Sequence, residues 1–222
     1  MPLHQETRRF VEAGLFSKLA SFDELEARIS LLDGKKRKGD AFEVFAEGYL
    51  ATQRKHDAAQ VWPQEATPSD VIGKLGLTNS DYGVDGVFQT ALGEFSAYQV
   101  KFRTDRKPLS WRELSTFIGL ADSAEISSRI LLTNSEEVPS LLNDRRGFFC
   151  IRGSDLDRLD ASDFSEIESW LSESFSESPK KEPLPHQKEA LDAIIPALRS
   201  FKGQTYRKFF FKCSQEQFIV PS

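Results

Sequence analysis

The residues best suited to chemistry are a carboxylate, an amide and an amine that lie close together in the chain. Gln99 and Lys101 are two positions apart in a run typical of a β-strand, so their side chains should project from the same face. Asp85 stands at the head of the preceding predicted strand. The 14-residue step from Asp85 to Gln99 is what a hairpin of two short strands needs to place these groups side by side. The spacing therefore predicts that Asp85, Gln99 and Lys101 share one site.

This set of groups suits the hydrolysis of a phosphodiester assisted by a divalent cation. Such an ion polarises the phosphate and acidifies a water, and oxygen ligands suit magnesium. Asp85 would supply an anionic ligand and the Gln99 carbonyl a neutral one. Lys101 would orient or help deprotonate the attacking water, or stabilise charge on the phosphate. Glu43, if its helix packs on the sheet edge, would add a second carboxylate through a metal-bound water, which makes it a fourth candidate for catalysis and metal binding.

Each of these residues also has an ordinary structural interpretation. Asp85-Gly86 is a pair common in hairpin turns, although a turn is already expected a few residues later. Gln99 and Lys101 could form the outward polar face of a strand. Glu43 could pair with Asp40 in a capping box at the start of a helix. The combination at matching distances favours the functional interpretation for the hairpin residues and leaves both interpretations open for Glu43.

The charge of the chain is unevenly distributed. The net charge is -5, but residues 155–177 hold eight acidic residues against one basic residue. Residues 101–112 hold five basic residues against one acidic residue, so a basic face for phosphates is compatible with an acidic protein. A basic run at 35–38 is most often a solvated loop, and a phosphate contact is the alternative. The candidates for nucleic-acid binding are Lys36, Lys38, Arg103, Arg106 and Lys107.

Hydrophobic periodicity predicts the elements that must position these groups. Residues 7–32 read as helix, in one or two pieces, residues 34–39 as a basic loop, and residues 40–54 as a helix with Asp40 as its N-cap. The remaining predicted elements are strands at 58–62, 84–90 and 95–102, a helix from Ser110, strands at 129–133 and 148–152, and a helix at 164–171. A variable loop is expected between the first two strands. This order predicts an α/β fold with a mixed central sheet flanked by helices.

These residues carry a resemblance to a known family. Gly83-Val84-Asp85-Gly86 followed by Gln99-Val100-Lys101, with Phe42-Glu43 upstream, resembles the Mrr-like branch of the PD-(D/E)XK nucleases, which has Gln where other branches have Glu or Asp. The resemblance covers about residues 36–155. It implies a restriction-endonuclease-like sheet and cleavage of double-stranded DNA that depends on Mg2+, with Mn2+ as a substitute.

A second resemblance begins after a Ser-, Glu-, Lys- and Pro-rich linker. Residues 182–190 resemble the stretch that precedes the motor of superfamily 2 helicases, and a nuclease followed by such a motor resembles the Type ISP restriction enzymes. The sequence has no Gly-x-x-x-x-Gly-Lys-Ser/Thr loop, so the ATPase itself is absent. The expected parts are an N-terminal helical segment (1–33), a nuclease-like domain (34–171), a linker (172–186) and a C-terminal helix and tail (187–222). A motor on a longer polypeptide or in trans is the implied partner.

Three classes of function follow. The first is an endonuclease of a restriction or phage-defence system. The second is a weakly active or inactive DNA-binding module that acts with a partner motor or nuclease, and the third is a scaffold whose C-terminal helix docks to another protein. Two cysteines far apart, no secretory signal and no apolar run long enough for a bilayer favour the cytoplasm and exclude a membrane partner.

Overall fold

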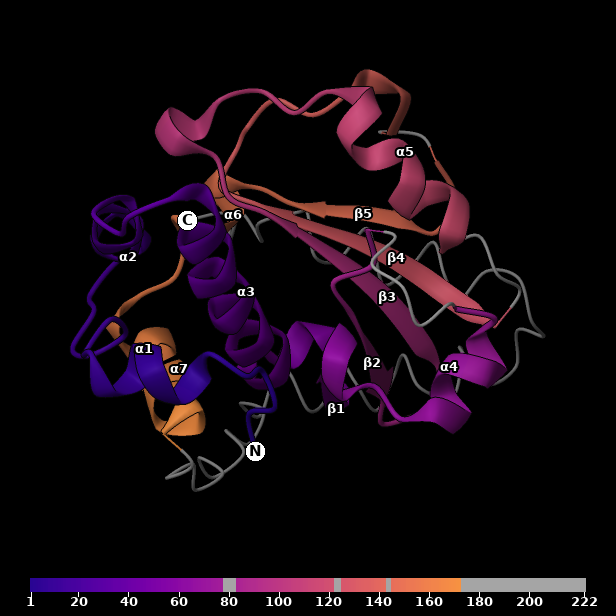
Figure 1. The fold of residues 1–222 in the computed structure, drawn as a ribbon, viewed down its shortest axis with the longest axis horizontal. Helices are drawn as coiled ribbons and strands as arrows, with labels where there is room; N and C mark the ends of the chain where they lie inside the picture. Colours follow the sequence, from indigo (N-terminus) through magenta and orange to yellow (C-terminus); the bar gives the residue numbers. More distant parts are fainter. Residues whose placement is uncertain (78–82, 122–124, 143–144, 173–222) are drawn as a thin grey trace, which may run out of the picture. The chain divides into compact units, whose positions relative to one another are not determined.

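A five-stranded mixed sheet forms the centre of the molecule (Figure 1). In the computed structural model, which describes residues 1–77, 83–121, 125–142 and 145–172, the strands lie in chain order. The strands are β1 (Ala58–Pro63), β2 (Gly86–Thr90), β3 (Phe95–Lys101), β4 (Ile126–Thr133) and β5 (Phe148–Ile151). β1, β2 and β3 pair antiparallel, whereas β3–β4 and β4–β5 pair parallel. The α/β fold with a mixed central sheet is therefore confirmed, and β3, which carries Gln99 and Lys101, is its middle strand.

Helices cover both faces of this sheet. They are α1 (Thr7–Glu12), α2 (Phe22–Ser30), α3 (Lys35–Thr52), α4 (Ser69–Leu75), α5 (Trp111–Leu120), α6 (Gly153–Leu156) and α7 (Ala161–Leu171). Short 3-10 turns are η1 (Arg54–His56), η2 (Gln64–Ala66), η3 (Thr104–Arg106) and η4 (Ser140–Leu142). Among the described residues, no helix has both the length and the apolar character needed to cross a membrane.

Alternate residues of the strands feed two separate hydrophobic cores. On one face, Tyr98 and Val100 of β3 pack with α3 and α7. On the other face, Phe95 and Ala97 pack with α4 and α5. Because neighbouring side chains on a strand point to opposite faces, Gln99 and Lys101 belong to the α5 face of the sheet.

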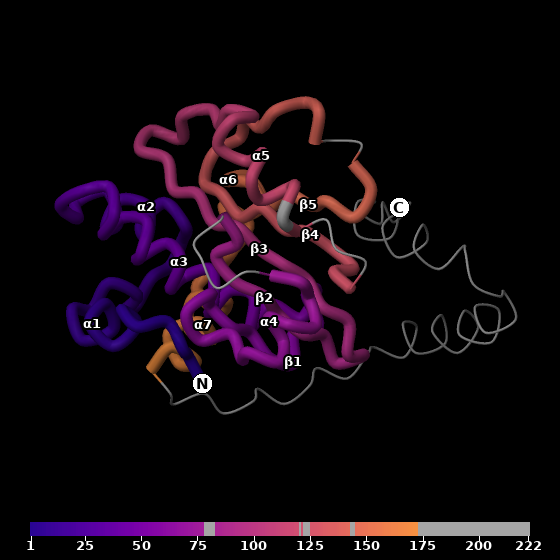
Figure 2. Tube along the Cα trace, turned by 45° about the vertical axis from the view of Figure 1, so that its right-hand side comes forward, coloured from indigo at the N-terminus to yellow at the C-terminus, as the bar shows by residue number. Residues whose placement is uncertain are grey.

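The N-terminal helices are part of the first core. Phe10 of α1 and Phe22, Leu25 and Ile29 of α2 are buried in the cluster that contains the apolar residues of α3. Phe22 lies against the ring of Phe42, with ring centroids 6.2 Å apart. Figure 2 shows α1 and α2 at the left of the view, with α4 nearer the centre.

Two local predictions were wrong. The basic stretch that was expected to be a loop is the first turn of α3, which begins at Lys35 after Gly34, a residue with φ of 80°. Asp40 therefore lies inside the helix and cannot cap it, so the capping-box alternative for Glu43 is excluded. The stretch between β1 and β2 contains α4 and η2, and α4 ends at Gly76 in the left-handed conformation that glycine tolerates. The expected linker and C-terminal helix lie, from residue 173 on, outside the described residues.

Candidate active site

The β2–β3 hairpin brings Asp85 against the strand that carries Gln99 and Lys101. Gly86 pairs with Tyr98, and the Asp85 N–H donates to the Tyr98 carbonyl at 3.0 Å. One carboxylate oxygen of Asp85 accepts a hydrogen bond from the Val100 N–H at 2.6 Å. β2 has not yet begun at this level, so the carboxylate satisfies a strand N–H that lacks a ladder partner there. The Asp85 carboxylate is thus held beside the backbone that lies between Gln99 and Lys101.

A glycine is required next to this carboxylate. A β-carbon at Gly86 would lie 2.3 Å from the ring end of Tyr98 and 2.4 Å from the Trp62 carbonyl oxygen. The Tyr98 ring therefore crosses the β2 backbone at Gly86, where its hydroxyl donates to the Trp62 carbonyl at 3.4 Å. Burial raises the pKa of the Tyr98 hydroxyl well above its usual value, and nearby carboxylates including Glu47 and Asp85 raise it further. Tyr98 therefore stays neutral, and its ring packs against the backbone of Gly86, the residue after Asp85.

The side-chain oxygen of Gln99 accepts no hydrogen bond from the described residues. Its side chain is only 2% exposed, and in the described part of the chain its Oε1 has no partner. Buried carbonyl oxygens are nearly always satisfied, so an exception needs an explanation. A divalent cation with a preference for oxygen ligands would satisfy this atom, and the Asp85 carboxylate, which is bonded to the next residue of β3, would supply the negative charge. The residues present at this point therefore fit such an ion.

Lys101 is half-buried at the end of β3, on the same face as Gln99. Its backbone carbonyl accepts a hydrogen bond from Thr133 Oγ1 at 2.7 Å. A half-buried ammonium two positions along the strand from Gln99 suits contact with a phosphate or a water near the amide.

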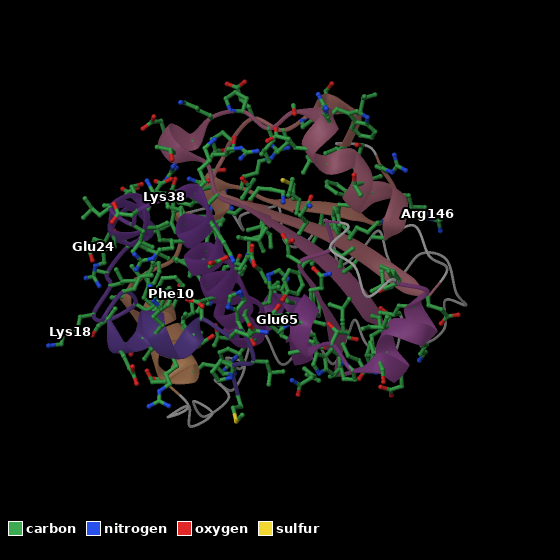
Figure 3. All side chains as sticks on the ribbon, in the orientation of Figure 1. Phe10, Lys18, Glu24, Lys38, Glu65 and Arg146 are labelled. Carbon is green, nitrogen blue, oxygen red and sulfur yellow. The ribbon has the colours of Figure 1, made fainter. Side chains whose placement is uncertain are left out.

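Glu43 comes from α3, and, in addition to burial, both Asp85 and Glu43 raise the pKa of the Tyr98 hydroxyl through their charge. α3 packs on the face of Tyr98 and Val100, whereas Gln99 belongs to the opposite face. There the Glu43 Oε2 lies 3.4 Å from His4 Nε2, and Glu65 Oε1 lies 4.0 Å from the same nitrogen. Figure 3 labels Glu65 near α3. Within the described ranges, no group of three or more His, Cys, Asp and Glu side chains is arranged to hold a metal ion.

A buried carboxylate next to Glu43 organises the N-terminus. Glu47, one turn further along α3, is fully buried and accepts backbone hydrogen bonds from Leu3 at 2.6 Å and His4 at 3.2 Å. Burial raises the pKa of Glu47 to about 7, even though these hydrogen bonds lower it. The sequence analysis missed this role of Glu47 and His4, because their partners are 44 and 43 positions apart in the chain and no local pattern marks such a contact.

The basic candidates fall into two groups. Arg106 is bound to three carboxylates: Glu26 at 2.9 Å, Asp157 at 2.7 Å and Asp23 at 3.3 Å. Arg103 pairs with Glu113. These ion pairs favour a structural role for Arg106, whose three guanidinium nitrogens are all engaged, and they occupy one end of Arg103.

The lysine candidates make fewer hydrogen bonds and ion pairs than Arg106 within the described residues. Lys36 and Lys107 are exposed. Lys38 is half-buried at the start of α3, labelled in Figure 3, and donates to the Ser30 carbonyl at 2.7 Å. Lys36 and Lys107 are therefore the candidates best placed to meet a phosphate.

Comparison with known proteins identifies the family of the chain. A family model described as a restriction endonuclease (Mrr_cat_2) matches residues 50–178, more than half of the chain. No curated protein matches the sequence.

Two solved structures match the chain. One is the ATP-dependent Type ISP restriction-modification enzyme LlaBIII bound to DNA, with 18% identity, a TM-score of 0.50, and coverage of 82% of this chain and 11% of that one. The other is the MspJI restriction endonuclease in complex with a 27-mer oligonucleotide, with 17% identity, a TM-score of 0.38, and coverage of 78% and 41%. This chain thus spans about a tenth of the length of the Type ISP enzyme. With the family match over the hairpin, α5 and the last two strands, the chain belongs to the Mrr_cat_2 family of restriction endonucleases.

Proposed function

We propose that the chain is a metal-dependent endonuclease domain that hydrolyses phosphodiester bonds of double-stranded DNA, with Asp85, Gln99 and Lys101 as its catalytic residues. The observation that carries this proposal is the buried Gln99 Oε1, which lacks a partner in the described residues and lies on the strand that the Asp85 carboxylate contacts. An amide oxygen and a carboxylate on adjacent strands, with an amine two positions further, form a set that phosphodiester hydrolysis can use.

Asp85 and Gln99 would hold the cation, and magnesium suits them because it is often bound through one or two carboxylates while waters and substrate phosphates complete its shell. When bound, the ion would polarise the phosphate and acidify a water. Asp85 is held by the Val100 N–H, so it is oriented before DNA arrives. Lys101 would place its ammonium against the phosphate or the attacking water.

Glu43 is proposed as a further metal ligand. Its carboxylate lies near His4, on the helix that packs on the Tyr98 face. We infer that Glu43 acts through a metal-bound water, so its substitution should affect cleavage less than that of Asp85.

The wider biological proposal is a restriction or phage-defence system. The similar Type ISP enzyme is described as an ATP-dependent restriction-modification enzyme bound to DNA, which supports DNA as the partner here and a motor on a longer polypeptide or in trans. We also propose that the nuclease-like part spans residues 34–171 and that a linker spans residues 172–186. Activity in the cytoplasm follows from the same proposal.

Cleavage of supercoiled plasmid tests the function directly. The wild-type chain should nick or linearise plasmid with Mg2+ or Mn2+ and lose activity with a chelator. Asp85→Asn keeps an oxygen for the Val100 N–H but removes the charge, and Lys101→Met keeps the apolar stem. Each should lower the cleavage rate by about 100-fold or more, the scale at which a positioned catalytic group contributes.

Two further variants sharpen the test. Gln99→Leu should abolish cleavage, whereas Gln99→Glu should keep metal-dependent cleavage because it retains an oxygen at the same position. Lys74→Met on α4 is the matched control, and it should cleave like the wild type. Salt-sensitive DNA binding without cleavage in any metal would instead support the inactive binding module.

A further inference from the structure

The end of β3 is held by side chains after its pairing with β4 stops. The last pair in the parallel ladder is Lys101 with Thr133. Beyond it, Asn134 Oδ1 accepts from the Arg103 N–H at 2.6 Å, and Asn134 Nδ2 donates to the Arg103 carbonyl at 2.7 Å. A carboxamide carries one acceptor and a donor group, as a peptide does, so Asn134 replaces the strand residue that would otherwise continue the ladder.

A carboxylate from α2 fixes the orientation of this amide. The Asn134 Nδ2 also donates to Glu26 Oε1 at 2.5 Å. Since an ionised carboxylate only accepts hydrogen bonds, Glu26 requires the NH2 group of Asn134 on its side and thereby places Oδ1 toward the Arg103 N–H. Asn134 is fully buried, which leaves it no water to exchange these bonds with.

Glu26 connects the N-terminal segment to the segment that follows β3. It also accepts from Arg106 Nε at 2.9 Å, three positions after Arg103. Glu26 lies outside residues 50–178, the part of the chain that the family model matches. The contact therefore adds a feature that the family match does not describe.

We propose that Asn134 and Glu26 are positioning residues that fix the exit of β3 and, through it, the ammonium of Lys101. This inference rests on the proposed nuclease function. We call the hydrogen bonds of Asn134 to Arg103 and Glu26 the Asn134 clamp. Lys101 is two residues before Arg103, which this clamp holds. The Lys101 carbonyl accepts a hydrogen bond from Thr133, which precedes Asn134. Loss of the clamp frees the strand end, and displacement of a catalytic group by about 1 Å costs on the order of 100-fold in rate.

The test uses variants that remove or keep the clamp. Asn134→Ala and Glu26→Ala remove it, whereas Glu26→Gln retains an oxygen that can accept from Asn134. Asp157→Asn is the matched control, because Asp157 binds Arg106 but makes no hydrogen bond to Asn134 among the described residues. Single-turnover cleavage, DNA affinity and the hydrogen exchange of the Arg103 amide are measured for each, at a temperature where all variants are folded.

The expected result is a rate of the chemical step lowered about 10- to 100-fold in Asn134→Ala and Glu26→Ala, with DNA affinity changed less than about threefold. Glu26→Gln should recover most of that rate, and Asp157→Asn should match the wild type. The Arg103 amide should exchange at least about tenfold faster in the two alanine variants only.

Other outcomes separate the two claims. If the wild type cleaves DNA and both alanine variants cleave at the same rate, the positioning role is overturned while the proposed function stands. A rate lost equally in Glu26→Gln and Asp157→Asn also overturns it, because the effect would then follow the Arg106 ion pairs. A wild-type chain that does not cleave under any metal condition overturns the proposed function first and the positioning role with it.

Discussion

At the scale of single residues, the choice of an amide at position 99 has a physical reason. The Gln99 side chain is almost fully buried. A carboxylate in such a place is costly to ionise, as Glu47 demonstrates with a pKa raised to about 7 by burial. A neutral amide can offer an oxygen there without carrying a buried charge when no cation is bound.

Glu47 leads to a prediction on pH. Its pKa in the folded state lies above the ordinary value of 4.5, so the folded state binds the proton more tightly than the unfolded state does. The associated stability is fully present below pH 4.5 and is lost as the pH rises through about 7. Glu47→Gln should remove this dependence, a difference of up to about 3 kcal/mol across that interval.

Urea unfolding of the wild type and of Glu47→Gln, at several pH values from 4.5 to about 7, measures how the free energy of unfolding depends on pH. A pH-independent difference between the wild type and Glu47→Gln would contradict the prediction.

Gly86 leads to a prediction on packing. A methyl group there would overlap both Tyr98 and the Trp62 carbonyl, and backbone atoms cannot move aside cheaply. Gly86→Ala should therefore destabilise the fold by about 1–3 kcal/mol or more. Gly39→Ala is the control, because a β-carbon at that position in α3 meets nothing within 4 Å, and helix propensity favours alanine by up to about 1 kcal/mol. Thermal unfolding of both variants measures the two effects. Equal midpoints would contradict the view that Tyr98 and the Trp62 carbonyl leave no room for a side chain at Gly86.

At the scale of elements, local signals were enough for most of the fold. Alternating and continuous apolar runs predicted all five strands in order, and the start of a helix at Ser110 was also predicted. The Glu113 carboxylate indeed accepts from the Ser110 N–H at 2.9 Å. The hairpin that brings Asp85 to β3 was also predicted, because both strands and their turn are contiguous in the chain.

Features set by distant contacts could not be predicted. Glycine and basic residues at 34–39 read as a loop, but α3, whose apolar face packs on α2 and the sheet, already begins at Lys35. Arg106 looked like a phosphate ligand because it follows β3, and only its approach to Glu26 of α2 and to Asp157 after α6 reveals its ion pairs. The role of Asn134 depends on a partner 108 positions away, which no local pattern marks.

At the scale of the whole molecule, two neighbouring cations should behave differently. Arg106 joins α2 to the loop after β3 and the segment after α6, whereas Lys107 is exposed. Arg106→Ala should lower the free energy of unfolding by roughly 1–3 kcal/mol, since it removes charged hydrogen bonds to several partners. Lys107→Ala should change it by less than about 0.5 kcal/mol.

DNA binding completes this comparison. Lys107→Ala should weaken binding to all sequences alike and reduce the slope of log affinity against log salt by about 1. The measurements are urea midpoints and salt titrations on two unrelated duplexes. Loss of binding to one duplex alone would argue against a phosphate contact by Lys107.

The sheet order has a consequence for synthesis on the ribosome. Asp85 and Gln99 come from one hairpin, whose pairing needs only residues 86–98. The support for the strand end at Lys101 comes from Thr133 and Asn134, which are translated after α5. The nascent chain can therefore pair this hairpin first, and the strand end at Lys101 gains its support from Thr133 and Asn134 only when β4 has emerged.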